Sequence, residues 1–138
     1  MKLKSIITTI FIIIASVISF FISELDMQKD DEVIPKGTKL NEKFYQERFC
    51  KKLNGLIEYR LPDATRIDCL TKDYAIEVDF AKKWAEGIGQ GLYYGIETNR
   101  KPAVALIVGQ KDGKFLKRIR KVAKKLDIKI FIIDKIEK

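Results

Sequence analysis

The sequence predicts an α/β domain built on a mixed β-sheet and preceded by an apolar leader helix. Three observations support this prediction: an uncharged apolar run near the N-terminus, three short alternating segments in succession, and later strands that alternate with helices. Strands joined by tight turns run antiparallel, whereas strands separated by helices are expected to run parallel. The expected order is α-β-β-β-α-β-α-β, with helices on the faces of the sheet.

The first residues have the pattern of a secretory signal. Lys2 and Lys4 precede an uncharged run over residues 6–22, and Glu24 follows it. A basic start, an apolar stretch and a polar exit are what export requires. Residues 1–23 are therefore expected to be a signal peptide, or an uncleaved signal anchor with its basic end in the cytoplasm. The expected localisation is periplasmic or extracellular, with membrane attachment if the segment is kept.

A polar linker over residues 24–40, which contains Pro35 and Gly37, is expected to join the leader to a folded domain over residues 41–138. In that domain Asn41 can cap a first helix, and Gly55 follows the end of the helix. Three alternating segments bounded by turn residues then indicate a β-meander. The expected helix lies at 41–53 and the strands at 56–61, 65–71 and 74–80.

The second half of the domain alternates helices and strands. A helix over residues 83–98 leads to the continuous apolar run 103–108, which is typical of a strand buried on both faces. Residues 115–126 carry apolar side chains at helical spacing among many lysines and arginines. A last strand is expected over residues 129–133.

Composition limits the chemistry. The chain has no histidine, so Ser-His-Asp triads, Cys-His dyads and histidine-based zinc sites are excluded. Its two cysteines, Cys50 and Cys69, are expected to form a disulfide if the domain is exported, and to be free buried thiols if it is cytoplasmic. The formal charge of +8 permits binding to nucleic acid or an anionic lipid surface without requiring either.

Two acidic residues are expected to face each other across a hairpin. If Lys72 and Asp73 form a two-residue turn, residue 71 pairs with 74 and Asp68 lies opposite Glu77. Opposed like charges are unfavourable unless a cation lies between them. Two such carboxylates could hold one or two Mg²⁺ or Mn²⁺ ions, and such ions polarise a phosphate and activate water.

An ordinary solvated hairpin is the alternative, in which Arg66 neutralises this face by pairing across the strands with Asp79. The helix that follows favours a site instead. Gln90 and Tyr94 are four residues apart, and Lys83 precedes Gln90 by seven, so the three share one stripe of the helix. Such a stripe is suited to be the wall of a site next to the acidic strand.

These elements and residues together resemble the PD-(D/E)xK nuclease superfamily, which has a restriction-endonuclease-like core. The resemblance covers about residues 41–133 and is strongest to a group of small exported proteins of unknown role. The shared stretches are Arg60-Leu61-Pro62-Asp63, Arg66-Ile67-Asp68-Cys69-Leu70, Glu77-Val78-Asp79, Lys83-Trp84, Gly89-Gln90 and Tyr94. This resemblance implies that Asp68 and Glu77 bind Mg²⁺.

The resemblance also implies roles for residues around the metal. Gln90 and Tyr94 match a motif of recombination-type nucleases, and Glu47 is the candidate for an acidic residue that the first helix often adds. The position two residues after Glu77 holds Asp79 where the superfamily has lysine. Lys83 is then the candidate for the missing amine. Asp79 would be a third metal ligand, or would mark a domain that has lost catalysis.

The predicted function is metal-dependent phosphodiester hydrolysis of DNA or RNA by an exported domain. Five basic residues are the predicted nucleic-acid contacts: Arg66, Lys82, Lys117, Arg118 and Lys121. The alternative is a catalytically inactive domain of the same fold that serves as a binding module in the cell envelope. Attachment to a membrane surface through the leader and the basic helix is a third hypothesis, and a simply solvated helix explains the basic residues equally well.

Overall fold

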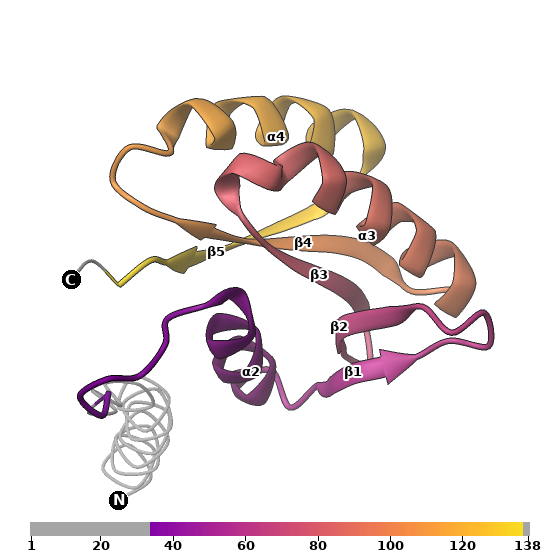
Figure 1. The fold of residues 1–138 in the computed structure, drawn as a ribbon. Coiled ribbons are helices and arrows are strands. Elements are labelled where there is room, and N and C mark those ends of the chain that lie inside the picture. The colour runs from indigo at the N-terminus through magenta and orange to yellow at the C-terminus, as the bar shows by residue number, and fades with distance from the viewer. Residues whose placement is uncertain (1–33, 137–138) are drawn as a thin grey trace, which may run out of the picture. The chain divides into compact units, whose positions relative to one another are not determined.

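A five-stranded sheet in the order β1-β2-β3-β4-β5 forms the central layer of the fold (Figure 1). The computed structural model describes residues 34–136. The first three strands are antiparallel neighbours, and β3, β4 and β5 run parallel, as the turns and helices between them predict. The strands are β1 (Leu56–Arg60), β2 (Arg66–Leu70), β3 (Tyr74–Phe80), β4 (Lys101–Val108) and β5 (Lys129–Asp134).

Helices cover both faces of this sheet (Figure 1). Helix α2 (Glu42–Lys52) lies on one face, and α3 (Trp84–Thr98) and α4 (Gly113–Leu126) lie on the other. A short 3₁₀ turn, η1 (Ala81–Lys83), connects β3 to α3. The helices and strands therefore follow the predicted order, and the fold class is mixed α/β.

The N-terminal end of α2 is fixed by the predicted cap. The side chain of Asn41 accepts a hydrogen bond from the backbone N–H of Phe44 at 3.0 Å. This bond satisfies one of the amide groups that the first turn of a helix leaves free. The C-terminal end is followed by Asn54 in a left-handed conformation, with φ of 51°.

The predicted disulfide between Cys50 and Cys69 joins α2 to β2, and both residues are fully buried. Gly55 makes room for it. A side chain at this position would place its Cβ 2.6 Å from the Cys69 sulfur and 2.7 Å from the Cys50 sulfur. Such distances are below any normal contact, so the disulfide and the glycine require each other.

Strand β4 supplies the centre of two apolar cores. Ala103, Ala105 and Ile107 point toward α2, while Val104 and Leu106 point toward α3 and α4, and all five are fully buried. A central parallel strand covered by helices on both sides has this continuous apolar character. The prediction from the run at 103–108 is confirmed.

Helix α3 lies unusually close to β4 because glycines face the strand. A Cβ added to Gly91 would lie 2.9 Å from the carbonyl oxygen of Ala103, and one added to Gly95 would lie 3.1 Å from that of Arg100. The helix therefore packs backbone against backbone along this line. The close approach brings the polar residues of α3 next to β3.

Several element boundaries differ from those predicted by one or two residues. Lys83 belongs to η1, and the α-helix begins one residue later at Trp84. Strand β4 begins at Lys101, before Pro102, because the Lys101 amide donates to the carbonyl of Asp73 and the residue pairs with Tyr74. Proline lacks an N–H but has a carbonyl group, so it is tolerated near the start of the strand.

The predicted leader, residues 1–23, and linker residues 24–33 lie outside the described residues. Linker residues 34–40 contain a turn in which the amide and hydroxyl of Thr38 donate to the Pro35 carbonyl, and contain no helix or strand. Within residues 34–136 no helix has the length and apolar character needed to cross a membrane.

Candidate functional site

The register predicted between β2 and β3 is observed where the two strands pair, with Cys69 opposite Ile76 and Leu70 opposite Ala75. The predicted pairs of Asp68 with Glu77 and of Arg66 with Asp79 are not part of this ladder. At Asp68 the side chain, and not the backbone, forms the hydrogen bond to β3. Its Oδ2 accepts a hydrogen bond from the backbone N–H of Val78 at 2.8 Å. The carboxylate of Asp68 is thereby fixed against β3.

Gln46 of α2 holds Asp68 from the opposite side. The buried Gln46 Nε2 lies 3.1 Å from Asp68 Oδ1, 3.1 Å from the Asp68 carbonyl oxygen and 2.8 Å from Glu58 Oε1. An amide nitrogen has only donors to offer, and all three partners are oxygen acceptors. Gln46 thus positions two acidic side chains with one group.

Asp68 and Glu77 open into a common pocket of about 330 Å³ on the α3 side of the meander. Gln90 and Tyr94 of α3 form one wall, as the stripe in the sequence predicts. The β1–β2 turn forms another wall. The lining residues are Glu58, Ala64, Thr65, Arg66, Asp68, Glu77, Gln90 and Tyr94. Five of the predicted site residues, from three separate elements, are therefore brought together: Arg66, Asp68, Glu77, Gln90 and Tyr94.

Both carboxyl groups titrate far from their ordinary range. Burial, followed by repulsion from Asp68 and then Asp79, raises the pKa of Glu77 to about 9. Burial also raises the pKa of Asp68 to about 6, although the hydrogen bond from Val78 N–H opposes the rise. Removing a carboxylate from water without a compensating charge disfavours its ionised form. A cation or a proton is needed to make this pair stable.

One oxygen of Glu77 is buried and unpaired in the part of the chain that the structure describes. Glu77 is 7% exposed, and no group within residues 34–136 forms a hydrogen bond to its Oε2. Buried polar atoms are nearly always bonded, so an unpaired one needs a physical explanation. Two carboxylates in a pocket of this size fit the donor set of Mg²⁺, which keeps several waters and takes one or two carboxylates.

The two carboxylates fit an ion that takes most of its ligands from water and from a substrate. In the described part of the chain, no group of three or more Asp, Glu, Cys or His side chains converges as a metal site. Asp79, predicted as a third ligand, lies outside the pocket lining. The three predicted metal ligands do not converge on one point.

Asp79 belongs instead to a neighbouring ion-pair cluster with Lys83 and Glu42. Lys83 Nζ lies 3.0 Å from Asp79 Oδ1 and 3.5 Å from Glu42 Oε2. Burial raises the pKa of Asp79 to about 7, and the bond to Lys83 opposes this. The predicted pairing of Asp79 with Arg66 does not form, because Arg66 pairs with Glu58 at 3.0 Å.

Lys83 is therefore engaged by two carboxylates and does not line the pocket. The structure also does not bring Glu47 to the site. Its side chain is half exposed and forms a long ion pair of 3.8 Å with Lys43, one turn earlier in α2. Lys82 lines a separate depression together with Leu40, Asp112 and Lys135. The predicted contacts on α4, Lys117, Arg118 and Lys121, are exposed and lie outside the pocket.

The sequence reasoning missed three residues of the site: Glu42, Gln46 and Glu58. Glu42 and Gln46 are one helical turn apart, so the periodicity of α2 offered a signal for both. Glu58 gave no signal. It adopts a left-handed conformation with φ of 55° in the middle of β1, which an ordinary strand pattern does not indicate.

The fold and the pocket together define a mixed α/β domain with a buried acidic site beside its antiparallel strands. No protein-family model matches the chain, and no solved structure matches it. The chain is 36% identical over 102 residues to a putative KilA-N domain-containing protein, L33, of Acanthamoeba polyphaga mimivirus. The alignment covers 72% of this chain and 40% of the relative, so the chain spans less than half the length of that protein.

Proposed function

We propose that this domain hydrolyses phosphodiester bonds of nucleic acid with a divalent metal ion, in the manner of the PD-(D/E)xK superfamily. The observation that carries the proposal is that Glu77, whose buried Oε2 has no hydrogen-bond partner among residues 34–136, lines one pocket with Asp68. The order of helices and strands along the chain, and the places of Gln90 and Tyr94 in it, add support, because the sequence resembles the superfamily in these features. Asp68 and Glu77 would hold the ion.

Each residue of the pocket has a task in this proposal. A bound Mg²⁺ or Mn²⁺ would polarise the phosphate and lower the pKa of an attacking water. Gln46 and the Val78 amide keep the Asp68 carboxylate oriented toward the pocket. Tyr94 is largely buried and lines the pocket together with Gln90, and its hydroxyl can donate to a phosphate oxygen.

The cluster around Lys83 favours a second candidate, a non-catalytic binding module of the same fold. The amine that would assist an attacking water is bound to Asp79 and Glu42, and no lysine occupies the position two residues after Glu77. In this candidate function the pocket binds a cation or a cationic group without cleaving a substrate.

A cleavage assay with matched variants tests the proposal. Plasmid DNA and a long RNA are incubated with the protein in Mg²⁺ or Mn²⁺, using Asp68→Asn and Glu77→Gln as isosteric variants. Asp73→Asn, an exposed carboxylate in the β2–β3 turn, is the control. We expect cleavage by the wild type and by the control, and losses of at least about 100-fold in the two site variants.

Mn²⁺ titration by calorimetry separates the two candidates. Binding that disappears in Asp68→Asn and Glu77→Gln without cleavage by any protein supports the binding module and refutes hydrolysis. If the wild type shows no Mn²⁺ binding and no cleavage, the metal site itself is refuted.

We also propose that the domain acts in an oxidising compartment, as its leader sequence suggests. Support comes from the buried Cys50–Cys69 disulfide, since such bonds rarely persist in the cytosol. Fractionation of cells that express the full chain, followed by thiol labelling before and after reduction, tests this. Free thiols in a cytosolic fraction would refute it.

A further inference from the structure

Almost all of the excess positive charge of the protein is concentrated on one helix. The chain has 27 basic and 19 acidic residues, and α4 holds seven of the basic residues and none of the acidic ones. The rest of the chain therefore carries 20 basic against 19 acidic residues and is nearly neutral. If the positive charge reflected only a lysine-rich composition, basic residues would be in excess over the whole surface. Here the excess lies on α4.

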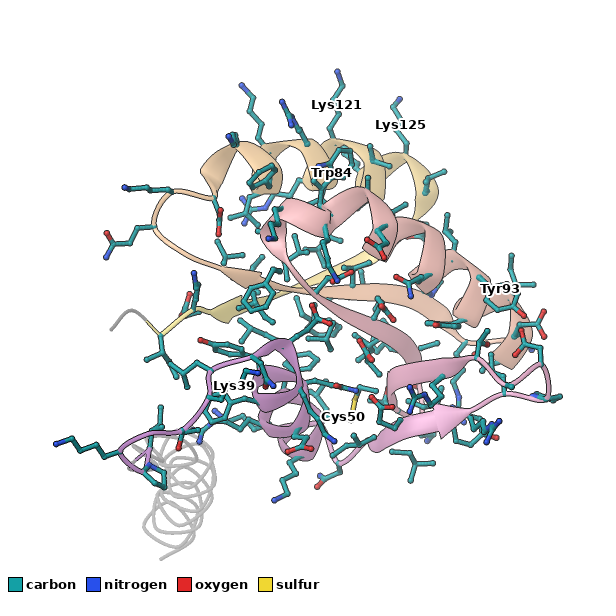
Figure 2. All side chains as sticks on the ribbon, in the orientation of Figure 1. Lys39, Cys50, Trp84, Tyr93, Lys121 and Lys125 are labelled. Carbon is teal, nitrogen blue, oxygen red and sulfur yellow. A yellow bond between two sulfur atoms is a disulfide. The ribbon has the colours of Figure 1, made fainter. Side chains whose placement is uncertain are left out.

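The charged face of α4 is presented outward by the packing of its other side. Ile119 and Ala123 are buried against the sheet and α3, and all seven basic side chains are exposed. Figure 2 shows Lys121 and Lys125 projecting from α4 away from the sheet. At 100° per residue the basic positions occupy an arc of roughly 160°.

The basic side chains of α4 form no ion pair with a carboxylate within residues 34–136. The ion pairs in that part of the chain involve α2, β1, β2, β3 and η1. Seven like charges on a helix of 14 residues repel one another. A polyanion that bound here would relieve this repulsion and release its own counterions.

We propose that the outer face of α4 is a docking surface for duplex DNA, bound through phosphates without reading the bases. A helix about 10–12 Å in diameter fits the major groove of B-DNA, which is roughly 12 Å wide. Cations over a wide arc can then reach the phosphates of both strands. The deep, narrow major groove of duplex RNA does not admit such a helix.

An anionic membrane is the competing partner, and the packing of α4 argues against it. Membrane-surface helices insert an apolar face below the headgroups. In α4 that face is already covered, because Ile119 and Ala123 are buried in the core. A flat bilayer would also meet only the outermost row of cations. The α4 surface shares no residue with the carboxylate pocket, so its role is independent of the proposed hydrolysis.

Salt-dependent binding tests this inference on the full chain. The probe is a fluorescent 20-base-pair DNA duplex of random sequence, titrated between 50 and 200 mM NaCl without divalent ions. We expect log Kd to rise with log salt with a slope of roughly 4 to 6, since each phosphate contact contributes about 0.9. Duplex RNA of the same length should bind at least about tenfold more weakly.

A triple variant, Lys117→Gln, Arg118→Gln and Lys121→Gln, removes three charges from the α4 face. We expect its slope to fall by about 3 and its affinity at 100 mM salt to fall at least tenfold. The control removes three exposed lysines elsewhere, with Lys51→Gln, Lys52→Gln and Lys72→Gln, and makes the same change in net charge. The control should lose no more than about threefold.

Three outcomes would overturn the inference. The first is an equal loss in both triple variants, which would assign binding to net charge alone. The second is duplex RNA binding as tightly as DNA. The third concerns vesicles that contain one-third phosphatidylserine. It is a loss of co-sedimentation with these vesicles in the α4 triple variant while that variant keeps its DNA binding. DNA binding retained by Asp68→Asn would show that α4 acts apart from the pocket, whether or not the protein cleaves DNA.

Discussion

Replacing Glu77 with glutamine should stabilise the domain at neutral pH. The folded protein raises the pKa of Glu77 from its ordinary 4.5 to about 9. Below pH 4.5 the carboxyl is protonated in both the folded and the unfolded states, so it contributes no difference. Above pH 4.5 the unfolded chain releases the proton and the folded chain keeps it, so the free energy of unfolding falls as pH rises toward 9.

The magnitude of this loss follows from the size of the shift. Each pH unit above 4.5 removes about 1.4 kcal/mol from the free energy of unfolding, so the loss reaches about 3 kcal/mol at pH 7. Glutamine has nearly the same shape as the protonated acid and carries no charge at any pH. Glu77→Gln should therefore be more stable than the wild type by up to about 3 kcal/mol at pH 7, and by less than about 1 kcal/mol at pH 5.

Urea denaturation at pH 5, 6, 7 and 8 in the presence of a chelator measures this difference. Glu47→Gln is the matched control, because Glu47 is exposed on α2 and outside the pocket. We expect the control to match the wild type within about 0.5 kcal/mol at every pH. A stability gain for Glu77→Gln that did not grow between pH 5 and pH 7 would refute the account of a carboxyl kept neutral by burial.

Three further changes have defined outcomes. Gln46→Ala removes three hydrogen bonds to buried or half-buried oxygens and should lower the free energy of unfolding by about 1–3 kcal/mol, measured by urea denaturation. Reduction of the Cys50–Cys69 disulfide, which closes a loop between residues 19 apart, should cost about 3 kcal/mol, seen as a lower melting temperature in reductant. Gly91→Ala should cost about 1–3 kcal/mol, because the new Cβ meets a carbonyl oxygen of β4 at 2.9 Å. Gly89→Ala on the exposed side of the same helix should be neutral or stabilising by up to about 1 kcal/mol, and an equal loss in both would contradict the close-packing argument.

Local signals in the sequence predicted much of the fold. Asn41 caps α2, the turn at Lys72-Asp73 sets the β2–β3 register, and the apolar run of β4 is buried on both faces. Each of these features depends on neighbours in the chain or on a simple period. The disulfide was predicted on the condition that the domain is exported, and two cysteines allow one pairing only.

The site was predicted in part because its residues depend on long-range packing. Asp68, Glu77, Gln90 and Tyr94 line one pocket, as register and helical spacing indicate. Glu47 was chosen on α2 by resemblance, yet the close packing of α2 on β2 selects another face of the helix, the one that carries Gln46. A helix's period gives its faces, but only the partner surface decides which face is buried.

The position of the Lys83 amine also depends on packing that the sequence does not indicate. Lys83 is four residues beyond Asp79, and the 3₁₀ turn places its side chain where it meets that carboxylate before it can reach the pocket. The periodicity of α2 groups Glu42 with Gln46 on one face of the helix, but it does not indicate that Glu42 meets Lys83.

The hydrogen bond from Val78 N–H to Asp68 Oδ2 also gives Asp68 a structural role. Its side chain accepts a bond from β3 that a backbone carbonyl would accept in a regular sheet. An oxygen at position 68 adds a hydrogen bond between β2 and β3 whether or not the domain turns over a substrate. An alanine there would remove both a charge and a structural acceptor. Asparagine, which keeps an oxygen, separates the two roles, and a descendant that had lost catalysis would still be selected to retain Asp or Asn at this position.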